Sequence, residues 1–114
     1  MIKFSILLRR NPEMTHEQFV TYHREHHAPL FMSMPVVQQH VRRYVQLHTL
    51  DVTLPGLPPT TIDGVTELWF DDVESIGAVF TDESYLEKIR PDEATFLDLH
   101  RCEFIVSEEH AVSG

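Results

Sequence analysis

Three of the eight histidines in this 114-residue chain, His23, His26 and His27, fall within five consecutive residues. Imidazole exchanges protons near neutral pH and is also a common metal ligand. A metal site needs three or four ligands, and no fixed further ligand is recognisable beside the cluster. The run HREHH matches neither HExxH nor HxxEH, because Glu25 is one position out of place for either motif. We therefore expect no metal, and we interpret His23 and His26 as packing residues on a helix.

His27 is the strongest candidate for proton transfer. It lies near the expected C-terminal end of a helix, where the helix dipole favours imidazolium and should raise the pKa above about 6.5. Such a group can donate or accept a proton at physiological pH. The alternative role is structural, with the imidazole hydrogen-bonded to the last carbonyls of the helix.

Tyr44 and His48 share one face of a strand expected over residues 40–50. The Tyr44 hydroxyl could donate a hydrogen bond to a developing oxyanion or enolate. It could instead be an interface tyrosine of a dimer. The rise of a strand separates His48 from Tyr44 by about 13 Å, so we expect both to line one cavity without touching.

The segment GVTELWF, residues 64–70, is a further expected strand whose orientation stays open. Glu67 and Trp69 share one face of it and Leu68 lies on the other. A cavity-facing Glu67 would have a raised pKa and could act as a base, whereas a cavity-facing Leu68 would leave Glu67 paired or exposed. We therefore retain His48, Leu68 and Trp69 as candidate substrate-binding residues.

Two segments near the N-terminus position the histidine cluster. Alternating apolar residues predict a strand over residues 2–8. Thr15, followed by Gln18, forms a capping box at the start of a helix, which we expect over residues 16–28. Pro29 should end that helix, because a proline disfavours helical backbone in the residue before it.

The rest of the chain completes the order β-α-β-β-α-β. In the strand over residues 40–50, the face with Val41, Val45 and Leu47 should pack on a helix. The expected remaining segments are a loop over 51–63, a helix after Asp71-Asp72, a short helical piece from Pro91 and a strand over 100–106. This order predicts one α+β domain over residues 1–114, a ferredoxin-like split unit. Its four-stranded antiparallel sheet would carry the helices on one face.

Composition excludes several classes of function. With 18 acidic and 9 basic residues the chain has a net charge of −9, which argues against nucleic acid or an anionic membrane as a partner. There is no apolar run of about 18 residues and no leader segment, so we expect a soluble, cytoplasmic protein. The glycines are scattered and Cys102 is alone, so we predict no nucleotide or other cofactor and no disulfide.

The sheet face that the helices leave uncovered should hold Tyr44, and also Trp69 in one of the two orientations of its strand, which makes the face too aromatic for open water. A second copy of the chain is the expected cover, and two sheets packed face to face would form a barrel across a homodimer. We expect a cavity in each half of that barrel, able to hold a small hydrophobic or aromatic ligand.

Four stretches of the chain, in order, resemble the EthD-domain proteins of the dimeric α+β-barrel superfamily. They are FSILLRRNPEMTHEQFVTYHREHHAPL, RRYVQLH, DGVTELWFDD and PDEATFLDL. The resemblance implies the barrel fold and a homodimer. It implies less about activity, because the family is named for the degradation of ethyl tert-butyl ether, where the protein's own role was left undefined.

Similar barrels act as lactone isomerases, as decarboxylases or dehydratases in aromatic polyketide pathways, and as cofactor-free monooxygenases, and some bind haem. A muconolactone methylisomerase relative uses a histidine and a tyrosine that match His27 and Tyr44, but has a cysteine where this chain has Leu68, which weakens the case for isomerase chemistry. The resemblance favours cofactor-independent acid–base chemistry on a cyclic or aromatic carbonyl compound, with His27 as proton shuttle and Tyr44 as hydrogen-bond donor. The alternative is a non-catalytic module that binds a hydrophobic small molecule.

Overall fold

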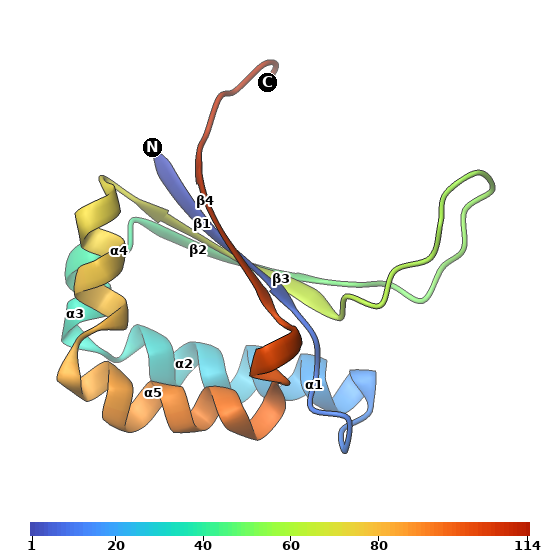
Figure 1. The fold of residues 1–114 in the computed structure, drawn as a ribbon, viewed down its shortest axis with the longest axis horizontal. Helices are drawn as coiled ribbons and strands as arrows, with labels where there is room; N and C mark the ends of the chain where they lie inside the picture. The colour runs from blue at the N-terminus through green and yellow to red at the C-terminus, as the bar shows by residue number, and fades with distance from the viewer.

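A computed structural model describes all 114 residues and has two layers, an antiparallel sheet and a layer of helices on one of its faces (Figure 1). The sheet order is β2-β3-β1-β4. The strands are β1 Ile2–Leu8, β2 Arg43–His48, β3 Gly64–Phe70 and β4 Glu103–Glu108. The helical elements are α1 His16–Tyr22, η1 His23–His27, α2 Ala28–Met32, α3 Pro35–His40, α4 Val73–Phe80, α5 Glu83–Phe96 and η2 Leu99–Arg101. The predicted ferredoxin-like arrangement is confirmed.

The first and third strands occupy the predicted residues, whereas β2 and β4 are shifted or shortened. Helix α3, which takes up the residues just before β2, was not predicted. Pro35 is in the first turn of α3, where the missing N–H of proline removes no helical hydrogen bond. The short turn η2 likewise delays the start of β4 beyond residue 100.

We expected the helix capped by Thr15 to end before Pro29, but the helical chain continues beyond that residue. The capping box is present, with Thr15 and Gln18 bonded reciprocally. A single π-helical turn, η1, then leads into α2, and the N–H of Ala28 bonds to the carbonyl of His23. Pro29 therefore falls in the first turn of α2, a position that tolerates proline.

The π-turn decides which histidine faces the core. Phe19, His23, His27 and Phe31 are all buried at four-residue intervals, whereas the His26 side chain is 59% exposed. Twelve residues of α-helix would rotate Phe31 by about 120° away from Phe19. The extra residue of the π-turn removes about 100° of that rotation. The expectation that His26 packs on the helix stripe was therefore wrong, and His27 takes the buried position.

The helix near the C-terminus is longer than predicted, because α5 begins far before Pro91. Asp82 caps it by accepting a hydrogen bond from the N–H of Tyr85. Pro91 lies inside α5 on its exposed side, where water can bond to the carbonyl that loses its helical donor. The continuous helix turns Asp92 and Glu93 toward the interior, and both are buried.

The predicted orientation of β2 was also wrong. Tyr44 pairs with Leu68 of β3, which in turn pairs with Phe4 of β1, so the three share the face covered by helices. The Tyr44 ring packs edge-on against Phe31 of α2, with 5.3 Å between ring centroids. Leu47 is on the opposite face and is 47% exposed. The polar face of β2 is the inner one because the helices offer it hydrogen-bond partners.

Residues 49–63 project as a long loop from the end of the sheet, and the C-terminal residues extend away from the opposite end (Figure 1). Buried Asp63 anchors the base of the loop, since it accepts hydrogen bonds from Arg10 and pairs with His16. None of the helices has both the length and the apolar character that crossing a membrane requires.

Candidate functional site

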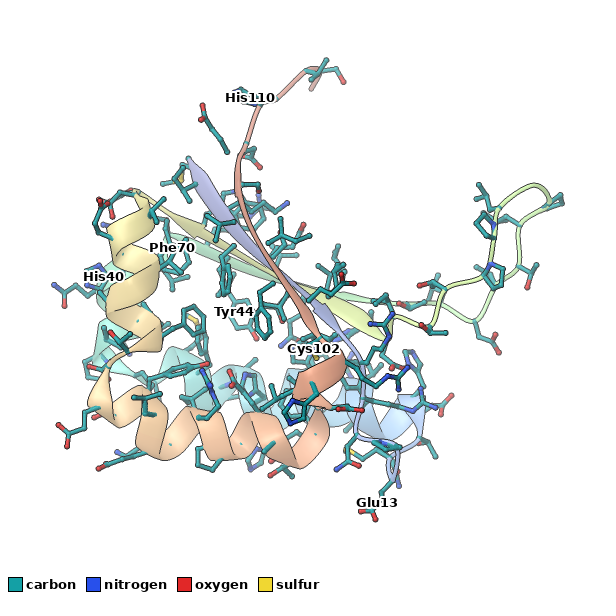
Figure 2. The ribbon with its side chains drawn as sticks, in the orientation of Figure 1. Glu13, His40, Tyr44, Phe70, Cys102 and His110 are labelled. Carbon is teal, nitrogen blue, oxygen red and sulfur yellow. The ribbon has the colours of Figure 1, made fainter.

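A small cavity lies between the sheet and the helices, on the side to which Tyr44 points (Figure 2). Its volume is about 20 Å³, room for about one water molecule. Twelve residues from both layers line it: Ile6, Leu8, His23, His27, Phe31, Tyr44, Thr66, Leu68, Phe80, Glu93, Phe96 and Leu97. Eight of them are hydrophobic, so the polar groups meet in a mostly apolar enclosure.

His27 and Asp92 form a buried histidine–carboxylate pair at the cavity. The Nδ1 atom of His27 is 2.8 Å from Oδ2 of Asp92, which fixes the orientation of the imidazole. The other ring nitrogen, Nε2, makes no hydrogen bond within the protein. Every side-chain nitrogen or oxygen that is shut off from solvent has a partner, so Nε2 keeps some accessible surface, and His27 is among the residues that line the cavity. The carboxylate thus holds the ring by Nδ1 and leaves Nε2 without a partner in the protein.

The pKa of His27 lies below its ordinary value, opposite to our expectation. Burial disfavours the imidazolium and lowers the pKa, and Asp92 offsets only part of that effect. We expected a helix C-terminus at His27 to raise this pKa. That effect is missing, because the chain continues from His27 into α2. His27 is consequently neutral at pH 7 and able to accept a proton.

Tyr44 presents a hydroxyl to the same cavity. Gln46 donates a hydrogen bond from its side-chain amide to the Tyr44 oxygen over 2.7 Å, which leaves the hydroxyl proton free to be donated. Burial is the main reason that the pKa of Tyr44 is raised to about 12; the bond from Gln46 opposes this rise and the charge of Glu93 contributes to it. The phenol therefore stays protonated and remains a hydrogen-bond donor at neutral pH.

His48 reaches the cavity indirectly, through His23. Nε2 of His48 lies 3.0 Å from Nδ1 of His23, and Nε2 of His23 lies 3.2 Å from the hydroxyl of Thr66. Burial, followed by the charges of His27 and His48, lowers the pKa of His23 to about 3. His23 is thus a neutral, doubly hydrogen-bonded cavity residue as well as a packing residue.

Two adjacent carboxyl groups of α5 make further contacts, and of the two only Glu93 lines the cavity. Asp92 also accepts a hydrogen bond from the Tyr22 hydroxyl and lies 3.3 Å from Nδ1 of His26. Glu93 accepts a hydrogen bond from the Tyr85 hydroxyl. Burial raises the pKa of Glu93 despite this bond. The two adjacent carboxyl groups are therefore held in different environments.

Of the predicted site residues, His27, Tyr44 and Leu68 line the cavity and Trp69 does not. Trp69 is on the open face of the sheet, between the side chains of Lys3 and Arg43. Its ring N–H donates to Glu109 over 3.0 Å. Glu67 shares that face and pairs with Lys3. The orientation left open for β3 is thus settled with Leu68 inward, and Trp69 is not part of the cavity wall.

Asp92 and Glu93 were not predicted to be site residues, although both lie in the segment PDEATFLDL. Placing a helix start at Pro91 concealed their orientation. The available signal was spacing: in a helix continued back through Pro91, the two acidic residues fall on the same stripe as Ile89 and Phe96. No three His, Cys, Asp or Glu side chains are grouped so that they could hold a metal ion.

The sequence profile of the EthD domain matches residues 11–100. An ethyl tert-butyl ether D (EthD) family protein from Bacillus halodurans superposes with a TM-score of 0.70 at 21% identity, covering 96% of this chain and 100% of that one. An EthD-like protein from Ralstonia eutropha JMP134 gives 0.63 at 16% identity, covering 98% and 92%. A dimeric protein of unknown function with a ferredoxin-like fold from Bacteroides fragilis gives 0.66 at 12% identity, covering 95% of each chain. No curated protein matches the sequence.

Proposed function

The chain belongs to the EthD domain family, and on this premise we propose that it catalyses acid–base chemistry on a cyclic or aromatic carbonyl compound. One observation carries the proposal. His27, oriented by Asp92, and the protonated Tyr44 meet at one mostly apolar cavity. A base oriented by a carboxylate, beside a hydrogen-bond donor, is the arrangement that enolisation of a carbonyl compound requires.

In the proposed reaction, neutral His27 accepts a proton at Nε2 from the carbon next to the substrate carbonyl. The electron pair of that C–H bond moves into the C–C bond, and the carbonyl oxygen becomes an enolate oxygen. Asp92 stabilises the imidazolium through its bond to Nδ1. His27 then returns the proton to the same carbon or to another carbon of the enolate.

Tyr44 donates its hydroxyl hydrogen bond to the enolate oxygen as negative charge develops there. The bond from Gln46 holds the phenol in place and makes its O–H a stronger donor. The raised pKa supports a role as hydrogen-bond donor rather than as an ionised nucleophile. Leu68 and the other apolar residues that line the cavity would contact the ring of the substrate.

The cavity as described has room for about one water molecule, so a ring-sized substrate requires its walls to move apart. Closure around the substrate would then exclude bulk water and strengthen the hydrogen bonds of His27 and Tyr44. The substrate-binding role of Leu68, and the role of His48 behind His23, belong to this proposal.

Exchange of α-protons in D2O, followed by ¹H NMR, tests the proposal with 2-tetralone as a defined aromatic cyclic ketone. The wild-type protein should accelerate deuteration above the buffer rate. His27→Gln should lose about 100-fold to 10,000-fold of the acceleration, the range typical of a positioned acid–base group. Tyr44→Phe should lose about 100-fold, as removal of an oxyanion donor does.

The matched control is His110→Gln, an exposed histidine in the C-terminal tail. Circular dichroism would establish that each variant is folded. Equal rates for wild type and folded His27→Gln would rule the proposal out.

The second candidate function is non-catalytic binding of a hydrophobic small molecule, which the eight apolar lining residues favour. In that case 2-tetralone would bind, as shown by shifts of cavity resonances, without any acceleration of deuteration. Affinity would then fall for Leu68→Ala and stay constant for His27→Gln.

We further propose that the working unit is a homodimer joined through the open sheet face. Trp69 and the exposed side chains of Leu47 and Ile105 lie on that face. A partner that covers the exposed side chains of Leu47 and Ile105 would remove apolar surface from water. The similar Bacteroides fragilis protein is described as dimeric.

A further inference from the structure

Three polar side chains form a continuous hydrogen-bonded row from the surface to the cavity. His48 bonds to His23 over 3.0 Å, and His23 bonds to the Thr66 hydroxyl over 3.2 Å. His48 is partly exposed, whereas His23 and Thr66 are buried and both line the cavity. The row therefore joins the solvent to the space that His27 and Tyr44 also face.

The row is fixed by packing from separate elements, since His48 comes from β2, His23 from η1 and Thr66 from β3. The His23 ring is stacked against Phe19 and Phe96, with centroids 5.5 Å away in each case. Both nitrogens of His23 face partners that can either donate or accept a proton. An imidazole in this setting can take up a proton at one nitrogen and release another from the opposite nitrogen.

We propose that His48, His23 and Thr66 form a proton relay between solvent and the cavity. The inference rests on the proposed function, because the exchange of substrate α-protons with D2O that this function predicts needs a path between solvent and the closed cavity. Neither His48 nor His23 is required to touch the substrate, so both act as relay residues rather than catalytic residues.

For inward transfer, His48 takes a proton from solvent at Nδ1 and gives the proton on Nε2 to Nδ1 of His23. His23 gives the proton on its own Nε2 to Oγ1 of Thr66. Thr66 passes its original hydroxyl proton to a water molecule or substrate in the cavity. One proton enters the row and one leaves it, so the three side chains end neutral with both imidazoles in the opposite tautomer, and the acceptor in the cavity gains one proton. The reverse sequence exports a proton.

The charges around the row favour neutral rings throughout. His48 faces Arg24 of η1 and His16 of α1, and burial together with these groups lowers its pKa. His23 faces His27 and His48, and its pKa is about 3. A long-lived imidazolium at His23 is therefore excluded at neutral pH, and the protons must shift along the row together.

The direct test is ¹⁵N NMR of protein labelled at histidine, which reports where the His23 ring proton sits and how fast it exchanges with water. In the wild type the proton should move between the two nitrogens, giving averaged ¹⁵N shifts. In His48→Gln the amide keeps a hydrogen-bonding group beside His23 but cannot relay a proton. We expect one fixed tautomer and about 100-fold slower exchange, the lower end of what a positioned acid–base group contributes.

His110→Gln is the matched control and should exchange at the wild-type rate. A second variant, Thr66→Val, cuts only the cavity end of the row while keeping the side-chain shape. It should leave exchange of the His23 ring proton with water unchanged and slow the deuteration of 2-tetralone.

Failure of the relay and failure of the proposed function give different results. If His27→Gln abolishes deuteration while His48→Gln leaves the His23 exchange rate at the wild-type value, the relay is overturned and the proposed function stands. If 2-tetralone is never deuterated but His48→Gln slows His23 exchange, the relay stands and the proposed function is overturned.

Discussion

His27 Nδ1 lies 2.8 Å from Asp92 Oδ2, although 65 residues separate the two in the chain. Two irregular features produce this contact. The π-turn η1 turns His27 inward in place of His26, and α5 continues through Pro91 so that Asp92 is buried beside the His27 ring. The functional pair therefore depends on two helices that both depart from a regular pattern.

Asp92→Asn should both destabilise the fold and release the His27 ring. The amide cannot accept as strongly from Tyr22 and His27, and its NH2 group would face a ring N–H. We expect a loss of about 2 kcal/mol in the free energy of unfolding, measured with urea, as is typical for a hydrogen bond to a charged group. The ¹⁵N shifts of His27 should change from one tautomer to a mixture. Retention of a single His27 tautomer would contradict the positioning role of Asp92.

Stability should fall as the pH is lowered from 7 to 5, mainly because of His23. Its pKa is about 3 in the folded protein and near 6.5 in the unfolded chain, so below pH 6.5 the unfolded chain binds more protons. Between pH 7 and pH 5, His23 alone should lower the free energy of unfolding by about 2 kcal/mol. In His23→Gln, urea unfolding at the two pH values should show a loss smaller by about that amount, whereas His110→Gln should keep the wild-type dependence. If the free energy of unfolding of His23→Gln fell with pH as much as that of the wild type, the prediction would be contradicted.

Asp63→Asn should loosen the base of the projecting loop. Burial raises the pKa of Asp63, but the bonds from Arg10 and His16 outweigh it, so the pKa lies below the ordinary value. This stabilisation is present above about pH 4 and is lost as the pH falls through the folded-state pKa. We expect the variant to be less stable by about 2 kcal/mol at pH 7 in urea. At pH 3 the free energies of unfolding of the variant and the wild type should lie closer together. An equal difference at both pH values would show that the ionised carboxylate of Asp63 is not what stabilises the fold.

Ile105→Arg should convert the proposed dimer to a monomer. The side chain is 43% exposed on the open sheet face, and two buried arginines facing each other across a two-fold interface would lack partners. Leu86→Arg is the matched control, because Leu86 is 46% exposed but lies on α5, in the helix layer. Size-exclusion chromatography with light scattering should give twice the chain mass for wild type and Leu86→Arg, and the chain mass for Ile105→Arg. A monomeric wild type would exclude the barrel dimer.

The sequence determined the architecture through local patterns. The alternating residues of β1, the run GVTELWF of β3 and the capping box at Thr15 are short-range signals, and the structure places these features at the predicted residues. The order of elements then restricted the topology to the split βαβ arrangement. His27 and Tyr44 were singled out mainly through the resemblance to the EthD family, with Tyr44 expected on the open sheet face; the structure places both residues at one cavity beneath the helices.

Tertiary structure decided how those side chains meet. Periodicity could not identify the inner face of β2, because hydrogen bonding of Gln46 to the His23 carbonyl makes the polar face the buried one. It could not anticipate the π-turn, since a change in helical period is a response to packing on both sides of the turn. Nor could it join His27 to Asp92, because a contact across 65 residues is specified by no local pattern. Local backbone preferences fix elements, whereas the pairing of buried polar groups is settled only when the layers close over them.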